Sequence, residues 1–129
     1  MTTETEVLNL FEKWNRALQT RDPEQVVALY AHDAILLPTV SNLVRHNHDE
    51  IRDYFERFLE KGPSGSIDEA NVRILGDIAI NSGIYTFDFA SSPAERVQAR
   101  YTFVYQQRAG EWLIIEHHSS VMPERFRAR

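Results

Sequence analysis

The residues best suited to chemistry lie together near the end of the chain, in the segment Glu116-His117-His118-Ser119-Ser120. This segment continues an apolar run that predicts a β-strand, in which adjacent side chains point to opposite faces. The two histidines therefore cannot bind one metal ion together unless a bulge intervenes. A histidine titrates near neutrality, so His118 could serve as a general acid or base, with Glu116 to orient it. The structural alternative is a hydrogen-bonded core histidine that fixes the end of the strand.

A hairpin argument assigns these side chains to faces. If Ala109-Gly110 forms a two-residue turn, a regular ladder pairs Tyr101 with His118 and Phe103 with Glu116. Paired residues share a face. That face would carry Tyr101, Phe103, Tyr105, Trp112, Ile114, Glu116, His118 and Ser120. A single bulge would exchange the outer halves of the two faces.

Two further groups could bind an ion. Arg100 begins a strand of aromatic and β-branched residues, where an arginine faces solvent or pairs across an oligomer interface. A bulge would turn it inward, and its fork would then suit an anion. The cluster His46-x-His48-Asp49 could be read as metal ligands. We expect no metal there, because Asp and His are frequent at helix starts and no third ligand has suitable spacing.

The elements that must position these residues fall into two halves. Thr3 and Glu6 have capping-box spacing before an amphipathic helix. Asp22-Pro23 predicts a second, short helix ending near residues 32–33. A third begins near Asn47 or His48 and ends at the loop 61–66. Strands are expected at about 34–37, 67–75, 78–90, 96–107 and 111–121.

Helices followed by hairpin-connected strands indicate an α+β fold, with three N-terminal helices packed in the concavity of a curved antiparallel sheet. The 129 residues are enough for one domain, 1–129. Both faces of the last hairpin carry apolar residues, which predicts at least a homodimer through the sheet face that does not cover the helices.

Composition excludes several classes of protein. There is no cysteine, which fits a reducing compartment and removes thiol chemistry. The formal net charge is −5, so nucleic acid is not an expected partner. No signal peptide and no membrane span are expected, and a cytoplasmic location is predicted. The basic tail, Arg125, Arg127 and Arg129, is typical of an ordinary chain end.

The segments LLPTVSNLVR, IRDYFERFL, SGIYTFDF, ARYTFVY and WLIIEHHSSVMPE together resemble bacterial relatives of the calcium/calmodulin-dependent protein kinase II association domain. This group lies within the nuclear transport factor 2-like, or SnoaL-like, superfamily. The resemblance spans about residues 6–124 and implies a cone-shaped, homo-oligomerising domain with a deep pocket. The kinase motifs themselves are absent.

The resemblance also implies pocket residues. His118 and Ser120 match the family pattern. Two positions at which the family has carboxylate-binding arginines are Tyr85 and Phe103 here, so carboxylate binding does not carry over. In some superfamily enzymes an acid near Asp33 works with a histidine of the sheet. The expected ligand-binding residues are Trp14, Tyr54, Phe58, Tyr85, Arg100, Tyr101, Phe103, His118 and Ser120.

Three functions follow as alternatives. The leading expectation is a homo-oligomer with a pocket for a small organic ligand. The second is a cofactor-independent isomerase, dehydratase or cyclase, with His118 and Asp33 as catalytic residues; some relatives carry an oxidoreductase label, yet no redox cofactor motif is present. The third is a structural adaptor whose cavity is filled by side chains. No cofactor is expected.

Overall fold

The computed structural model describes residues 1–124, except for the side chains of 92–94, and the arginines of the predicted basic tail lie outside the described residues. Its helices are α1 (Glu4–Gln19), α2 (Pro23–Val27) and α3 (His48–Phe58), followed by the short 3-10 helix η1 (Leu59–Lys61). Its strands are β1 (Tyr30–Leu37), β2 (Pro63–Leu75), β3 (Ile78–Phe89), β4 (Ser92–Arg108) and β5 (Glu111–Val121).

The helix starts follow the local signals in the sequence. Thr3 and Glu6 form a capping box, in which each side chain satisfies the other's backbone N–H. The side chain of Asn47 caps α3 by accepting from the backbone N–H of Glu50. The predicted end of the second helix is wrong, because α2 stops at Val27 and the chain is already a strand at Tyr30. There the carbonyl of Leu29 accepts a hydrogen bond from the Ile114 N–H of β5, so pairing with a distant strand ends the helix.

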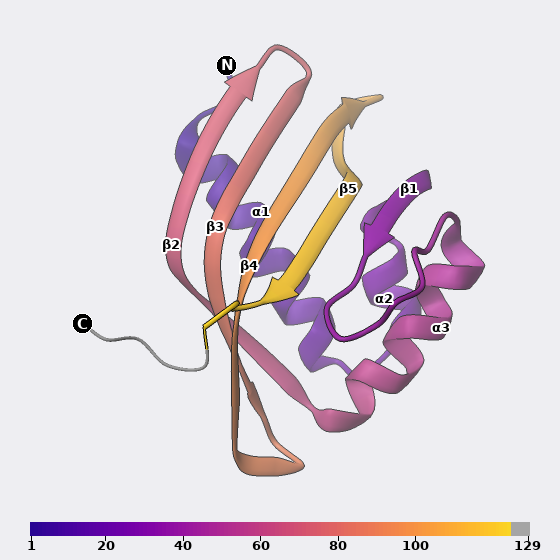
Figure 1. Cartoon of the computed structure of the whole chain (residues 1–129). Coiled ribbons are helices and arrows are strands. Elements are labelled where there is room, and N and C mark those ends of the chain that lie inside the picture. Colours follow the sequence, from indigo (N-terminus) through magenta and orange to yellow (C-terminus); the bar gives the residue numbers. More distant parts are fainter. Residues whose placement is uncertain (125–129) are drawn as a thin grey trace.

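The five strands form one curved sheet in the order β1-β5-β4-β3-β2. All neighbours are antiparallel except β1 and β5, which are parallel. Parallel strands need a long connection, and here α3, η1 and the other three strands lie between the two. Figure 1 shows α1 crossing one face of the sheet, with α2 and α3 gathered beside β1. The predicted α+β architecture, with three helices in the hollow of a curved sheet, is confirmed.

A β-bulge in β5 decides which side chains enter the hollow. Tyr105 pairs with Ile114 and Val104 with Glu116, so Ile115 has no partner of its own. Beyond the bulge, Phe103 pairs with His117 and Tyr101 with Ser119. The regular register predicted from the turn is therefore wrong in its outer half. The physical reason is that a regular ladder would place the Glu116 carboxylate opposite Phe103 in the apolar interior, and burying an unpaired charge is costly.

The inner face of the sheet and the helices enclose an aromatic core. Its largest fully buried side chains include Phe11, Trp14, Tyr30, Tyr85 and Phe103. Close aromatic contacts bind these rings to one another; for example, the Trp14 and Phe103 centroids are 5.2 Å apart in an edge-to-face arrangement. The side chains of three helices and four strands therefore fill most of the hollow.

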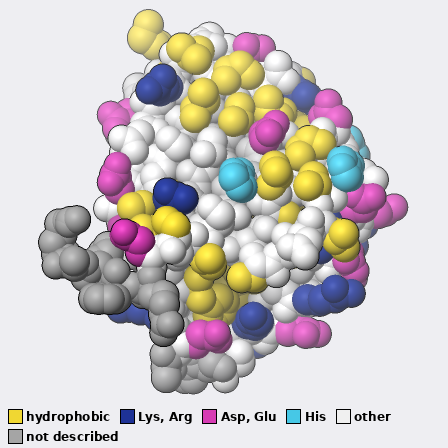
Figure 2. Space-filling view, in the orientation of Figure 1, with side chains coloured by type: hydrophobic (Ala, Val, Ile, Leu, Met, Phe, Trp, Pro, Cys, Tyr) yellow, Lys and Arg dark blue, Asp and Glu magenta, His cyan; other side chains and the backbone are white. Residues whose placement is uncertain are grey.

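The outer face of the sheet is partly apolar as well. Cross-strand pairing places Ile78, Ile80, Val104 and Leu113 on this face, all half-buried in the monomer, and we call these four residues the outer patch. Figure 2, which views the molecule from the sheet side, shows hydrophobic side chains gathered over the sheet. Charged groups flank the patch, with Glu116 beside Val104 and Arg100 further along β4.

Candidate functional site

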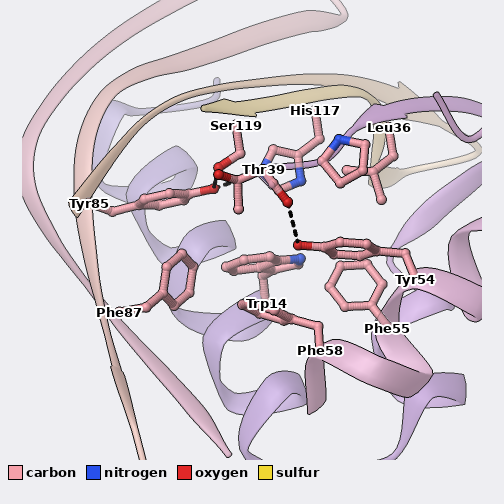
Figure 3. Close-up of a pocket in the computed structure, with 11 residues that line it drawn as sticks. Trp14, Leu36, Thr39, Tyr54, Phe55, Phe58, Tyr85, Phe87, His117 and Ser119 are labelled. Atoms are coloured by element: carbon pink, nitrogen blue, oxygen red, sulfur yellow. Dashed lines mark hydrogen bonds between the residues drawn. The ribbon is translucent and has the colours of Figure 1, made fainter. Parts of the chain in front are cut away.

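An interior pocket lies where α1, α3 and the inner face of the sheet meet (Figure 3). Aromatic and aliphatic side chains form most of its wall, and the polar groups gather on the side of β5 and of the loop after β1. The lining residues are Trp14, Leu36, Pro38, Thr39, Tyr54, Phe55, Phe58, Tyr85, Phe87, His117 and Ser119.

A chain of four hydrogen bonds runs along this pocket. The Trp14 indole N–H donates to the Tyr30 hydroxyl at 3.2 Å, and this hydroxyl lies 2.8 Å from His117 Nδ1. On the other side of the imidazole, Nε2 lies 3.2 Å from the Tyr85 hydroxyl, which donates to Ser119 Oγ at 2.8 Å. All five side chains are buried.

With Tyr85 donating to Ser119, one direction of the chain leaves both tyrosine hydroxyl hydrogens paired. Trp14 can only donate, so the Tyr30 hydroxyl accepts from it and donates to His117 Nδ1. The imidazole hydrogen is then on Nε2 and is donated to Tyr85, whose own hydrogen goes to Ser119. This arrangement requires the neutral, Nε2-protonated form of His117. Burial agrees with it, because the loss of hydration lowers the pKa of His117 to about 3, with a smaller contribution from the charge of His118.

The tyrosines of the chain are neutral for the same reason. Burial raises the pKa of Tyr30 and of Tyr85 well above the ordinary tyrosine value. Burial also raises the pKa of Tyr54 to about 12, although the nearby Arg45 opposes the shift. The interior network therefore consists of neutral hydrogen-bonding groups at physiological pH.

The chain ends with unused hydrogen-bonding capacity at the polar end of the pocket. Ser119 accepts from Tyr85, and its own hydrogen has no partner among residues 1–124. Beside it, the buried Thr39 Oγ1 also has no partner within the described part of the chain. The Tyr54 hydroxyl reaches the Thr39 carbonyl at 3.5 Å, a long contact. Buried polar groups usually have partners, so this end of the pocket is suited to a molecule that can donate and accept hydrogen bonds.

The free space in the interior is small, whereas a hollow beside it is larger. The interior pocket has a volume of about 10 Å³, room for a single water molecule. Next to it, and sharing Tyr54 and Phe58 with it, lies a hollow of about 200 Å³ between α3 and the loop 38–45, which we call the vestibule. A third hollow of about 470 Å³ lies outside the same loop and reaches Ser119 and Thr39 from the surface.

The structure brings together some of the predicted ligand-binding residues and separates others. Trp14, Tyr54, Phe58 and Tyr85 line the interior pocket. Tyr101 and Phe103 are buried directly behind it. Phe103 stacks on the His117 ring with centroids 4.0 Å apart, and Tyr101 donates to Asn81 at 2.8 Å.

The remaining predicted residues do not face the interior. His118, Ser120 and Arg100 lie on the outer face, because the bulge reverses β5 while the ladder around Arg100 is regular. Their predicted interior placement is therefore wrong, although His118 and Ser120 line the third hollow. Asp33 is exposed on β1 and pairs with Arg108, 3.1 Å away, which holds the pKa of the Asp33 carboxyl below its usual value. His118 and Asp33 thus do not meet in the pocket.

The sequence prediction missed His117, Ser119 and Thr39. The sequence did contain a signal for His117 and Ser119. A regular register would bury the Glu116 carboxylate against the apolar core, which is unfavourable. Turning Glu116 outward turns His117 and Ser119 inward. The cluster at the start of α3 is structural: His48 Nε2 lies 2.8 Å from the Tyr30 carbonyl oxygen, and His46 Nδ1 lies 3.0 Å from a Glu50 carboxylate oxygen. Within residues 1–124 there is no group of three His, Asp or Glu side chains placed to hold a metal ion.

Comparisons with known proteins agree with this architecture. Residues 3–123 match the family described as the calcium/calmodulin dependent protein kinase II association domain. A Xanthomonas campestris protein of known structure, assigned to the same association domain, is 51% identical, with a TM-score of 0.92 over 96% of this chain and 91% of that one. The curated proteins contain no match to this chain.

More distant structures share the fold. A nuclear transport factor 2-like protein of unknown function from Pseudomonas putida is 21% identical, with a TM-score of 0.81 over 95% of this chain and 88% of that one. A ketosteroid isomerase-like protein from Erwinia carotovora is 17% identical, with a TM-score of 0.72 over 92% of this chain and 95% of that one. The fold is that of the nuclear transport factor 2-like proteins.

This chain belongs to the calcium/calmodulin dependent protein kinase II association domain family. None of the helices in residues 1–124 is both long and apolar enough to cross a membrane.

Proposed function

We propose that this protein is a homo-oligomeric member of its family that receives a small organic molecule in the cone. Membership of an association-domain family supports the oligomer. One observation supports a ligand: Ser119 and Thr39 have unused hydrogen-bonding capacity at the end of an apolar pocket.

Association through the outer patch would bury apolar side chains that are half-exposed in the monomer. Ile80 and Val104 lie opposite each other at the centre of the sheet, where a solvated face would carry polar residues. Arg100 and Glu116 lie on the same face, at different positions along the strands. In a dimer with a two-fold axis across the strands, Arg100 of each copy would lie near Glu116 of the other. Such reciprocal contacts are what a self-complementary interface requires.

The molar mass in solution tests association. Light scattering coupled to gel filtration should give at least twice the monomer mass of 15.0 kDa at micromolar concentration. Val104→Asp places a carboxylate in the outer patch and should give the monomer, whereas Leu43→Asp, at an exposed loop position, should leave the mass unchanged. A wild-type monomer would contradict the proposal.

The pocket supports binding more than proton transfer. Both ring nitrogens of His117 are engaged by tyrosines, so this imidazole is not free to take a proton from a substrate. The small interior volume also supports the alternative of a structural adaptor whose cavity is filled. Saturable binding of a small aromatic molecule would support the ligand-binding function, and its absence would support the structural adaptor.

Phenol is a suitable probe, because its ring matches the aromatic wall and its hydroxyl can accept from Ser119 and donate to Thr39. The free space holds only a water molecule, so phenol binds only if the lining side chains move apart, which a filled adaptor would not allow. Titration with phenol should shift the Trp14 indole N–H resonance to saturation, and Ser119→Ala should weaken this binding. Ser120→Ala, on the outer face, is the matched control and should bind as the wild type does. An unsaturable or absent shift would favour the filled adaptor.

A further inference from the structure

The vestibule has a charge that the interior pocket lacks. Its wall consists of Val40, Ser41, Arg45, Tyr54, Arg57, Phe58 and Lys61. Three of these side chains are cationic and none is acidic. They come from three separate segments, namely the loop after β1, the last turn of α3 and the end of η1, so the cluster exists only in the folded chain.

Nearby carboxylates do not neutralise this cluster. Arg45 Nη1 lies 3.0 Å from Asp53, and Arg57 lies 3.6 Å from the other oxygen of the same carboxylate. Lys61 has no carboxylate partner among residues 1–124, and its ammonium group lies over the Phe89 ring at 5.6 Å. Three cations against one shared carboxylate leave a formal surplus of two positive charges.

Arg45 gives this charge a fixed position. Its side chain is only 7% exposed, and it donates to the carbonyls of Leu43 and Glu50 and to the Ser41 hydroxyl, besides Asp53. A guanidinium held in this way is already oriented before a ligand arrives. Arg57 and Lys61 are exposed at the rim of the vestibule, where both can contact a bound anion.

The wall also contacts the apolar part of a ligand. Tyr54 and Phe58 line both the vestibule and the interior pocket, with their rings stacked at a centroid distance of 5.6 Å. A molecule whose charged group meets the three cations would therefore lay its apolar body along these rings, toward the interior.

We infer that the vestibule binds the phosphoryl group of a small phosphate monoester that has an apolar or aromatic body. A phosphate monoester carries close to two negative charges at neutral pH and offers three strong acceptor oxygens. These match the charge surplus, the Arg57 guanidinium, the Lys61 ammonium group and the one N–H of Arg45 that its four internal hydrogen bonds leave free. This inference rests on the small-molecule binding proposed above and adds the chemical class of the ligand.

The experiment compares phenyl phosphate, phenol, benzoate and inorganic phosphate, each titrated at pH 7.5 and low salt and followed by backbone amide resonances. Phenyl phosphate should bind at least about tenfold more tightly than phenol, since charge-assisted hydrogen bonds are the stronger ones. The double variant Arg57→Gln/Lys61→Gln should remove most of this advantage and leave phenol binding unchanged. Arg73→Gln, an exposed arginine on β2, is the control and should bind all four compounds as the wild type does.

The possible outcomes distinguish the phosphoryl site in the vestibule from small-molecule binding in the interior pocket. If phenol binds but phenyl phosphate binds no more tightly, or benzoate binds equally well, the phosphoryl site is wrong while small-molecule binding stands. If phenol does not bind but phenyl phosphate and inorganic phosphate shift the vestibule resonances in a manner that depends on Arg57 and Lys61, the vestibule site stands and the interior pocket fails. At pH 5 the monoester is largely a monoanion, so the affinity for phenyl phosphate should fall.

Discussion

His117 lies at the centre of the interior hydrogen-bond chain, and its neighbour His118 lies on the outside of the same strand. His117→Ala would leave the hydroxyls of Tyr30 and Tyr85 without their common partner and would open a cavity, at a cost of roughly 2–4 kcal/mol in the free energy of unfolding. His118→Ala should change it by no more than about 0.5 kcal/mol. Urea unfolding of the two variants makes the comparison, and equal losses would contradict the register of β5.

The low pKa of His117 links stability to pH. Above about pH 6.5 the imidazole is neutral in both the folded and the unfolded chain. Below that value His117 becomes protonated in the unfolded chain, whereas in the folded chain it stays neutral down to about pH 3. The free energy of unfolding should therefore fall as the pH decreases from about 6.5, by at most about 1.4 kcal/mol per pH unit from this group.

His117→Gln has no titrating group at this position and should lack that part of the pH dependence. Urea unfolding of the wild type and the variant between pH 7.5 and pH 4.5 should give curves that converge as the pH falls. His118→Gln is the control and should keep the wild-type slope. Parallel wild-type and His117→Gln curves would mean that the folded protein admits a charged His117.

The repeated pairs His117-His118 and Ser119-Ser120 do not by themselves show which histidine faces inward. The sequence offers His twice and Ser twice in succession, so either register places one of each in the interior. The deciding residue is Glu116, whose carboxylate a regular ladder would bury. The identity of Trp14, Tyr54, Phe58 and Tyr85 as pocket residues was predictable, because large aromatic residues at helix and strand periodicity mark an inner face.

At the scale of the elements, Arg45 connects the loop after β1 to α3. Arg45→Met keeps the apolar stem but leaves the carbonyls of Leu43 and Glu50 without their donor, which should cost about 1–3 kcal/mol. Hydrogen exchange of the Leu36 and Arg45 amides, which form a backbone bridge, should become faster. Arg57→Met, on the exposed side of α3, should leave both measurements close to the wild-type values, and equal effects of the two variants would show that the loop does not depend on Arg45.

The pairing of β2 with β3 depends on a glycine. The register shifts between Ile67 and Glu69, and next to this bulge Gly83 pairs with Ala70, where a Cβ on Gly83 would collide with the Glu69 carbonyl oxygen. Gly83→Ala should therefore force the two backbones apart and lower the free energy of unfolding by about 1–3 kcal/mol. Ser82→Ala, one residue earlier, is the control. Thermal melting measures both, and a Gly83→Ala variant as stable as wild type would contradict the close approach.

Elements with local signals were predictable, and elements set by distant partners were not. The capping box at Thr3 and the cap at Asn47 marked helix starts because cap residues act within one turn. The start of β1 at Tyr30 depends on a parallel partner more than eighty residues later, as the pairing with Ile114 shows. Nor did the polar composition of the loop after β1 reveal that Arg45 would be buried in it.

At the scale of the whole molecule, association should make stability depend on concentration. An interface that exists only between folded chains raises the melting temperature as the protein concentration increases. The midpoint for the wild type should thus rise between 2 μM and 200 μM, concentrations chosen to span roughly two decades. The midpoint for Val104→Asp should stay constant. A constant wild-type midpoint together with a monomeric mass would contradict association through the outer patch.

The sequence also predicted the cone but not the volume inside it. The number of aromatic residues was visible, yet whether their rings leave a space depends on how they pack, as Trp14, Phe103 and His117 do around one another. That arrangement is a property of the folded chain as a whole.

The bulge at Ile115 has a consequence for changes in the length of β5. Losing Ile115 or Glu116 would close the bulge into a regular ladder and leave His117 opposite Phe103 and Ser119 opposite Tyr101. Losing one histidine instead would bring His118 and Ser120 to those two positions, like for like, because each residue type is repeated. The strand thus contains one residue more than a regular ladder needs, and it repeats each residue type that faces the interior. Deletion of Ile115, Glu116 or one histidine should therefore leave the interior hydrogen-bond chain intact, whereas substitution of His117 would break it.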